Sequence, residues 1–204
     1  MLINYQQHKK DRSCKLYPMT QSQLIQHFSA PDRKITVAKL GHQLKRENFS
    51  MRELVDLTFH PDKDIALKSS HLLVYILFKF PENYYNDLEY FISCAENAGT
   101  PASRKAYAKI LMHITSPEVS RDVRHKMKEI ELERVVELCF GWMIDPKMPV
   151  NVRSSAAEAL FNMRHRYPWI AEELSKQLEF MARTASPILL AKCNYILSYL
   201  HPED

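Results

Sequence analysis

The sequence is poor in glycine: of its 204 residues only Gly41, Gly99 and Gly141 are glycine. An average protein contains about 7% glycine. The glycine-rich loops that bind phosphates in nucleotide-binding folds are therefore not expected. A barrel of tight hairpins, whose turns need glycine, is not expected either. The 11 prolines, by contrast, are spread along the chain and indicate regular breaks between elements.

Cysteine pairs and long apolar runs are also missing. The four cysteines, Cys14, Cys94, Cys139 and Cys193, form no CxxC motif, so neither a zinc ribbon nor a dense disulfide framework is indicated. We interpret them as small buried side chains in a reducing compartment. The longest apolar run, residues 72–78, is far shorter than the ~20 residues of a membrane span. Because the first 15 residues also lack the apolar segment of a secretory signal, we predict a cytoplasmic protein with no membrane partner.

The common catalytic motifs are absent as well. The sequence has no HExxH, GxSxG or P-loop motif, and its nine histidines show no metal-ligand spacing. The carboxylates of residues 82–99 lie among aromatic residues, which is typical of a solvated face beside a core rather than of a general acid–base pair. We predict no catalytic residue, no metal and no cofactor, and we do not expect a small-molecule substrate.

What the sequence does contain is a basic tail followed by a helical pattern. Residues 1–19 have no helical period and carry four basic residues against one aspartate, a net charge of +3. They are predicted to form a flexible tail. Residues 20–204 are predicted to form a single domain of helices, whose starts are marked by hydroxyl caps. These caps are Ser50, which forms a capping box with Glu53, and the hydroxyl residues before proline at Thr100, Ser116 and Ser186.

The predicted helices come in pairs that are joined by turns containing proline. The turns at Pro31, Pro61, Pro101, Pro149 and Pro187 recur every 30 to 48 residues. A repeat of this length is typical of an α-solenoid, in which each helix pair buries its apolar face only by stacking on its neighbours. We therefore predict an all-α fold, an α-α superhelix of about five helix pairs. An irregular helical bundle is the alternative.

The fourth helix pair carries a family resemblance. A turn with proline is followed by a basic residue and then by small and aliphatic residues, in the segment Arg153-Ser-Ser-Ala-Ala-Glu-Ala-Leu160. This pattern resembles the second helix of a HEAT-type repeat, and the resemblance extends over most of residues 20–201. It implies a HEAT-like solenoid in which the second helices of successive pairs line one long face.

Charge is separated between the first and second helices of the pairs. The first helices are acidic, with a net charge of −4 in residues 82–99 and −3 in residues 129–143. The second helices are basic, with +4 in residues 33–47 and +3 in residues 104–113. The face that the resemblance assigns to the second helices is therefore basic, and a basic face attracts an acidic partner. We predict a non-enzymatic interaction scaffold that binds an acidic protein or peptide.

Ten residues of successive second helices are candidates for this face. Four basic residues near the helix starts are predicted to form a ladder: Lys34, Lys68, Arg104 and Arg153. Three further residues form a stripe along one helix: Lys105, Lys109 and His113. The remaining three are predicted on the same side: His42, His71 and Asn162. The aromatic residues expected to border the face are Tyr75, Tyr107 and Tyr199.

Two alternatives stay open. The first is structural: the ladder residues bridge to aspartates of the turns, and positive charges at helix C-termini are favoured by the helix dipole without any partner. The second is nucleic-acid binding, with glycosylase-like activity left open, because DNA alkylation-repair glycosylases are built from HEAT-like repeats and bind DNA on a basic face. Trp142 and Asp145 stand at the end of an acidic first helix, so no catalytic residue is carried over. Residues 145–151 are superficially similar to the mobile loop of fumarase/aspartase-type lyases but lack its serines and its lysine.

Overall fold

A computed structural model describes residues 19–29 and 36–201, and over these residues the chain is helical throughout, with no strand. The helices are connected by short turns, and one segment, residues 81–97, is divided into three 3-10 turns and one short α-helix. The α-helices are α1 (Gln21–Ser29), α2 (Val37–Arg46), α3 (Met51–Leu57), α4 (Lys63–Lys79), α5 (Leu88–Ser93), α6 (Pro101–Ile114), α7 (Arg121–Glu129), α8 (Glu133–Ile144), α9 (Val150–Met163), α10 (Trp169–Ala182) and α11 (Pro187–Leu200). The 3-10 turns are η1 (Pro81–Asn83), η2 (Tyr85–Asp87) and η3 (Ala95–Asn97).

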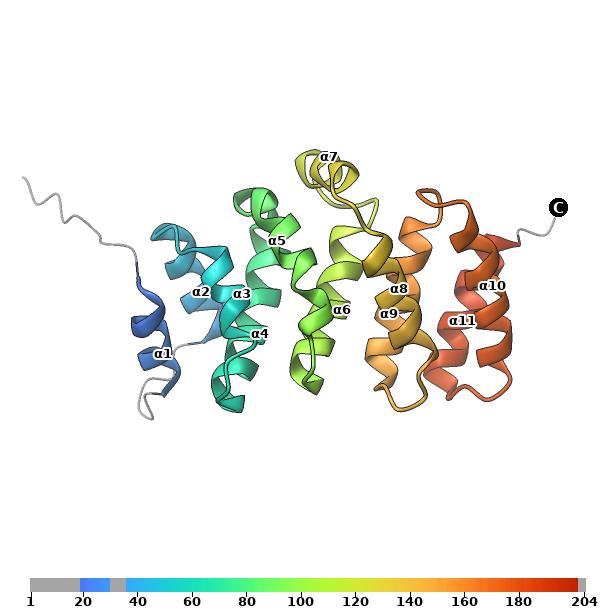
Figure 1. The fold of residues 1–204 in the computed structure, drawn as a ribbon, viewed down its shortest axis with the longest axis horizontal. Coiled ribbons are helices and arrows are strands. Elements are labelled where there is room, and N and C mark those ends of the chain that lie inside the picture. The colour runs from blue at the N-terminus through green and yellow to red at the C-terminus, as the bar shows by residue number, and fades with distance from the viewer. Residues whose placement is uncertain (1–18, 30–35, 202–204) are drawn as a thin grey trace, which may run out of the picture.

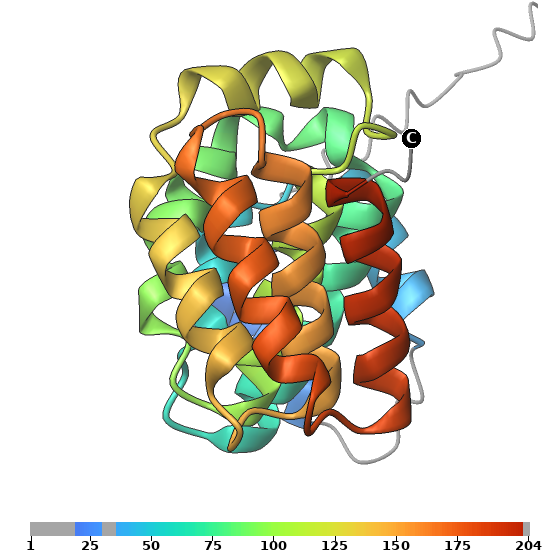
Figure 2. The same ribbon diagram turned by 90° about the vertical axis from the view of Figure 1, so that its right-hand side faces the viewer.

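The helices form a row of stacked pairs in two layers (Figure 1). One layer is made by α2, α4, α6, α9 and α11, each of which contacts the next along the row. The helices α3, α5, α8 and α10 lie on one side of this layer, as the view along the row shows (Figure 2). This arrangement confirms the predicted all-α superhelical stack of about five helix pairs.

The prolines of the predicted turns stand where the second helix of a pair begins. Pro101 and Pro187 are the first residues of α6 and α11, where the missing N–H costs nothing. Pro149 is the N-cap of α9, and Pro61 precedes Asp62, whose carboxylate accepts hydrogen bonds from two N–H groups at the start of α4. The turn at Pro31 and most of the predicted tail lie outside the described residues.

Three predicted helix starts differ in detail. The Ser50 hydroxyl accepts from the Glu53 N–H at 3.4 Å, but among the described residues the Glu53 carboxylate makes no return bond, so only half of the predicted capping box is present. Ser186 makes no side-chain cap to α11. Ser116–Pro117 is not a helix start at all, because the chain makes a turn there and α7 begins only at Arg121. The N-cap of α7 is Ser120, whose hydroxyl accepts from the Val123 N–H.

The helix α7 does not belong to any pair. It lies across the upper edge of the stack, near the middle of the row, and leads the chain from the layer of α6 back to α8 (Figures 1 and 2). Val123 and Met127 are its buried residues, and they face the stack. The prediction of simple pairs missed this helix, although its four basic residues are visible in the sequence.

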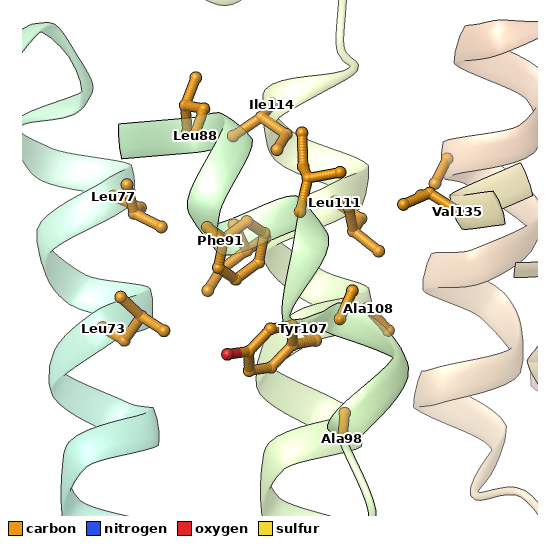
Figure 3. Packing of buried hydrophobic residues seen from close by; sticks show 14 of the residues in the cluster. Leu73, Leu77, Leu88, Phe91, Ala98, Tyr107, Ala108, Leu111, Ile114 and Val135 are labelled. Atoms are coloured by element: carbon orange, nitrogen blue, oxygen red, sulfur yellow. The ribbon is translucent and has the colours of Figure 1, made fainter. Parts of the chain in front are cut away.

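The core runs without interruption along the row, between the two layers. At its centre the rings of Phe91 and Tyr107 stack with their centroids 4.6 Å apart, surrounded by leucines of α4 and α6 (Figure 3). The Tyr107 hydroxyl lies 3.3 Å from the Thr58 hydroxyl, and both side chains are fully buried. The expectation that Tyr107 borders an exposed face is therefore wrong: it fills the core.

The three cysteines that the structure describes are all free thiols. Cys139 and Cys193 are buried and free, and burial raises the pKa of Cys139 to about 12, so its thiol stays protonated at neutral pH. Cys94 is free and half-buried.

None of the helices that the structure describes is both long and apolar enough to span a membrane.

Candidate functional site

The predicted ladder is present, but its side chains are used inside the fold. The Arg104 Nε donates to the Ala98 carbonyl at 3.0 Å, and the Arg153 Nε donates to the Met143 carbonyl at 2.9 Å. The Lys68 Nζ donates to the Phe28 carbonyl at 2.6 Å. All three carbonyls lie at or near the C-terminus of the first helix of the same pair or of the pair before, where helix carbonyls lack partners within the helix. These three side chains therefore cap helices.

The ladder ends before the last pair. Arg104 and Arg153 are the fourth residues of α6 and α9, and the fourth residue of α11 is Leu190. Of the three side chains that cap helices, only Lys68 also pairs with an aspartate. Its Nζ lies 2.5 Å from Oδ2 of Asp64, which is one turn earlier on α4. The structural alternative is thus closest to the observed contacts, with backbone carbonyls in place of the expected aspartates of the turns. Lys34 lies outside the described residues.

The stripe on α6 forms a cluster with an aromatic ring of α4. His113 stacks on Phe78 with a centroid distance of 3.9 Å, and the Lys109 Nζ lies 5.2 Å from the centre of the same ring. Burial lowers the pKa of His113, and its Nε2 has no hydrogen-bond partner among the described residues. Lys105, one turn before Lys109, is exposed. Lys105, Lys109 and His113 thus lie along one side of α6, and their role in binding a partner stays a prediction.

A second cluster of the same kind joins α2 to α4. The His42 ring meets the rings of Tyr75 and Phe80 edge-on, at centroid distances of 6.4 and 5.0 Å. The Lys45 Nζ lies 4.5 Å from the centre of the Phe80 ring. His71 is exposed on α4 and makes no contact of this kind. Lys45 and Phe80 thus form a cation–π contact, as Lys109 and Phe78 do in the first cluster.

Asn162 has a structural position. Its amide donates to the Met112 carbonyl at 3.1 Å and to the Thr115 hydroxyl at 3.3 Å, so it ties α9 to the C-terminal end of α6. Tyr199, by contrast, is more than half exposed on α11 and packs against Phe161 with a centroid distance of 6.0 Å. Tyr75 is half-buried in the cluster with His42.

The lysines of α2, α4 and α6 are mostly not neutralised. Within the described ranges, six of the seven have no carboxylate within 4 Å: Lys63 at the start of α4, and Lys39, Lys45, Lys79, Lys105 and Lys109. We call the last five residues the lysine face. On the same layer, Lys68 pairs with Asp64 and Lys192 with Glu158. Since unpaired lysines on neighbouring helices add their fields, the lysine face is a region of positive potential.

The structure adds a cavity that sequence analysis missed. It has a volume of about 470 Å³ and lies between the C-terminal ends of α6 and α9, against α7 and Tyr199. Its charged lining residues are all basic, Arg124, Lys128, Arg164 and Arg166, and His165 lies beside them. In the sequence, the arginines after α9 are explained by the helix dipole alone, and without knowledge of α7 nothing indicates a cavity beside them.

The chemistry of these sites is electrostatic. Among the residues that the structure describes, no group of three or more His, Cys, Asp or Glu side chains is placed to hold a metal ion. The lysine face and the cavity offer ammonium and guanidinium groups beside aromatic rings, a combination that binds anionic groups.

Comparison of the chain with known protein families, curated proteins and solved structures gives no match in any of the three.

Proposed function

We propose that this protein is a non-enzymatic interaction module of HEAT-like architecture, whose lysine face docks an acidic protein or peptide. The observation that carries the proposal is that five lysines on three successive helices have no ion-pair partner among the described residues. Leaving like charges side by side costs stability. A partner that supplies carboxylates removes this repulsion, and it is steered to the face by the same field.

The likeness to HEAT repeats has two supports. The second helices α4, α6 and α9 follow one another in a single layer, and each holds the end of a first helix through a basic side chain. A scaffold of this kind presents a long face to a partner because each pair contacts only its neighbours.

An acidic peptide fits this face better than nucleic acid does. Proteins that bind single strands stack bases on free aromatic faces. Here one side of Phe78 is covered by His113, and Lys109 lies over the same ring. Phe80 is buried and packed between His42 and Lys45. Histidine and lysine side chains therefore already cover both rings, so the rings are not free to stack on bases. The lysine ammonium groups remain free to pair with carboxylates.

The test is fluorescence polarisation with labelled oligoglutamate and with labelled single- and double-stranded DNA. The measurements are made at about 50 mM and about 200 mM salt. We expect oligoglutamate to bind, and the double variant K105E/K109E to weaken its binding about tenfold or more. The matched control is K147E/R183E, which makes the same change of charge at exposed positions in turns away from the lysine face.

Three results contradict the proposal. If DNA binds more tightly than oligoglutamate and its affinity falls with salt at about 0.9 per phosphate contact on a log–log plot, the face belongs to nucleic acid. If neither probe binds at the lower salt concentration, or if the control variant weakens binding as much as K105E/K109E, the lysine face is not a docking site.

A further inference from the structure

The cavity beside α7 is basic on its rim. Four cations line it, Arg124, Lys128, Arg164 and Arg166, together with His165, and no Asp or Glu is among the lining residues. Within the part of the chain that the structure describes, none of the four has a carboxylate within 4 Å. Glu131, in the turn before α8, interacts electrostatically with Arg166, but its carboxylate accepts a hydrogen bond from the Tyr167 hydroxyl and is not paired with any of the four cations.

Not all of these cations are occupied by the fold. Arg166 donates to the carbonyls of Met127 and Ile130 and so fixes the end of α7. Arg124 donates one N–H to the Pro117 carbonyl, and Arg164 donates one to the Phe161 carbonyl. A guanidinium has five N–H donors, so Arg124 and Arg164 keep most of theirs. The Lys128 side chain is exposed, and its ammonium has no hydrogen-bond or ion-pair partner among the described residues.

The positive charge of the rim exceeds the negative charge of the helix ends beside it. The C-termini of α6, α7 and α9 lie near the cavity, and each contributes about half a negative charge. Four formal positive charges outweigh these three half-charges. The helix dipoles therefore do not neutralise the four cations.

The floor of the cavity is apolar. It is formed by the outer edge of the core, with Ile114, Met127 and Leu132 all buried. Phe161 and the exposed ring of Tyr199 form the wall on the side of α11. A volume of about 470 Å³ is within the range of pockets that hold a ligand group. An apolar floor under a cationic rim is complementary to an apolar group with negative charges close to it.

We propose that this cavity holds the anchor residue of the acidic partner, an aromatic side chain with carboxylates on the neighbouring residues. The inference rests on the proposed function, since the cavity extends the same layer: Lys109 and Ile114 are separated by about 8 Å along α6. An extended peptide of seven residues spans roughly 23 Å, so one peptide reaches both the cavity and the lysine face. Buried anchor residues of this kind supply most of the binding free energy of an interface, and the charges around them raise the rate of association.

Three labelled peptides test the inference. They are Glu-Glu-Glu-Trp-Glu-Glu-Glu, its counterpart with glycine in place of tryptophan, and its counterpart with glutamine in place of every glutamate. We expect the tryptophan peptide to bind about tenfold more tightly than the glycine peptide, and the glutamine peptide to bind weakly. The variant R124Q/K128Q removes the advantage of tryptophan, whereas R121Q/K147Q, with the same change of charge outside the cavity, retains it.

The possible failures are separable. If the glycine peptide binds as tightly as the tryptophan peptide and both depend on Lys105 and Lys109, the anchor is refuted and the docking face stands. If only the tryptophan peptide binds and K105E/K109E has no effect, the cavity stands and the docking face is refuted. If no peptide binds, both fall. Thermal unfolding of each variant checks the fold, and the single variant K128E, at an exposed position with no contact to lose, repeats the test if R124Q/K128Q is unstable.

Discussion

At the scale of single residues, His113 shows how packing determines a charge state. Its ring stacks on Phe78, and burial lowers its pKa below the ordinary value of 6.5. The folded protein therefore takes up a proton on His113 less readily than the unfolded chain does.

This difference predicts a loss of stability in acid. As the pH falls below about 6.5, the unfolded state binds more protons at this site than the folded state, so the free energy of unfolding decreases. Above the pKa of the unfolded chain the contribution is fully present. We expect urea unfolding from about pH 7.5 to about pH 5 to show a larger decrease for the wild type than for H113F, which keeps the stacked ring and does not titrate. The other histidines are common to both proteins, so equal decreases would contradict the argument.

The residue scale is also where sequence analysis was least informative. Lys105 and Lys109 were predicted on an exposed stripe, and the spacing of four residues was enough to show it. Arg153 and Asn162 have the same polar character in the sequence, yet both are used to satisfy backbone carbonyls. Which helix end lies within reach of a side chain depends on the tertiary contacts, and no local pattern reports it. Tyr107 was misplaced for the same reason, because a tyrosine on a helix has no local mark of burial.

At the scale of elements, the ladder determines how the two helices of a pair stay together. The Met143 and Ala98 carbonyls stand at the ends of first helices and receive their hydrogen bonds from Arg153 and Arg104. A carbonyl that loses its only partner in a half-buried position costs about 1–3 kcal/mol. We predict that R104M and R153M each lower the free energy of unfolding by about this amount. K105M, next to Arg104 but exposed, should change it by less than about 0.5 kcal/mol. Chemical denaturation measures all three, and an equal effect of K105M and R104M would refute a capping role.

A second element-scale prediction concerns the close contact of α2 and α4. A Cβ atom on Gly41 would lie 2.5 Å from Tyr75 Cδ1 and 2.7 Å from Cε1, closer than atoms can approach. Tyr75 is itself packed against the rings of His42 and Phe80, so it does not simply move away. Alanine gains about 1 kcal/mol of helix propensity over glycine. We nevertheless expect G41A to destabilise the protein by about 1–3 kcal/mol, because overpacking outweighs that gain.

The control for this prediction is a double-mutant cycle. In a Y75A background the space beside Gly41 is open, and G41A should then become stabilising through helix propensity alone. If G41A has the same effect in both backgrounds, the contact with Tyr75 does not explain the glycine.

Predictability from sequence was highest for the helix pairs and lowest for α7. The pairs are marked by prolines at Pro101, Pro149 and Pro187, whose fixed φ and missing N–H allow them only at helix starts or in turns. The segment 121–129 is strongly basic and has only two buried residues, Val123 and Met127, so its apolar pattern is weak. It is held along the edge of the stack by contacts with α6 and the 3-10 turns η1 and η2, which no local pattern reports. The cavity depends on α7 and could not be predicted without it.

At the scale of the whole molecule, the separation of charge follows from the two layers. The pattern of acidic first helices and basic second helices predicted two faces of opposite sign, and the layers of the structure place these helices on opposite sides. The lysines of α2, α4 and α6 are thus collected on one layer, although they are spread over some 70 residues of sequence. The sequence predicted this separation because it depends only on the alternation of helices. It could not predict how much of the charge is used internally.

The stack also predicts how stability is distributed along the molecule. Each pair contacts its neighbours, so damage at the end of the row should stay local, while damage in the middle should spread. Leu189 of α11 and Leu160 of α9 are both fully buried leucines, but α11 contacts only α9 and α10 extensively, whereas α9 contacts α6, α8, α10 and α11. Truncating either to alanine costs about 2–5 kcal/mol at the site.

Hydrogen exchange followed by mass spectrometry should separate the two variants. We expect L189A to speed exchange in α10 and α11 while α2, α4 and α6 keep their wild-type rates. L160A should speed exchange in every helix from α6 to α11, because the central layer is interrupted where it joins the two halves of the row. If L189A instead speeds exchange equally in all helices, the chain unfolds as one cooperative unit, and the contacts between neighbouring pairs are strong enough to couple both ends. In that case a ligand in the cavity beside α7 would stabilise the distant α2 as much as α9; in the local case its protection should fade with each pair along the row.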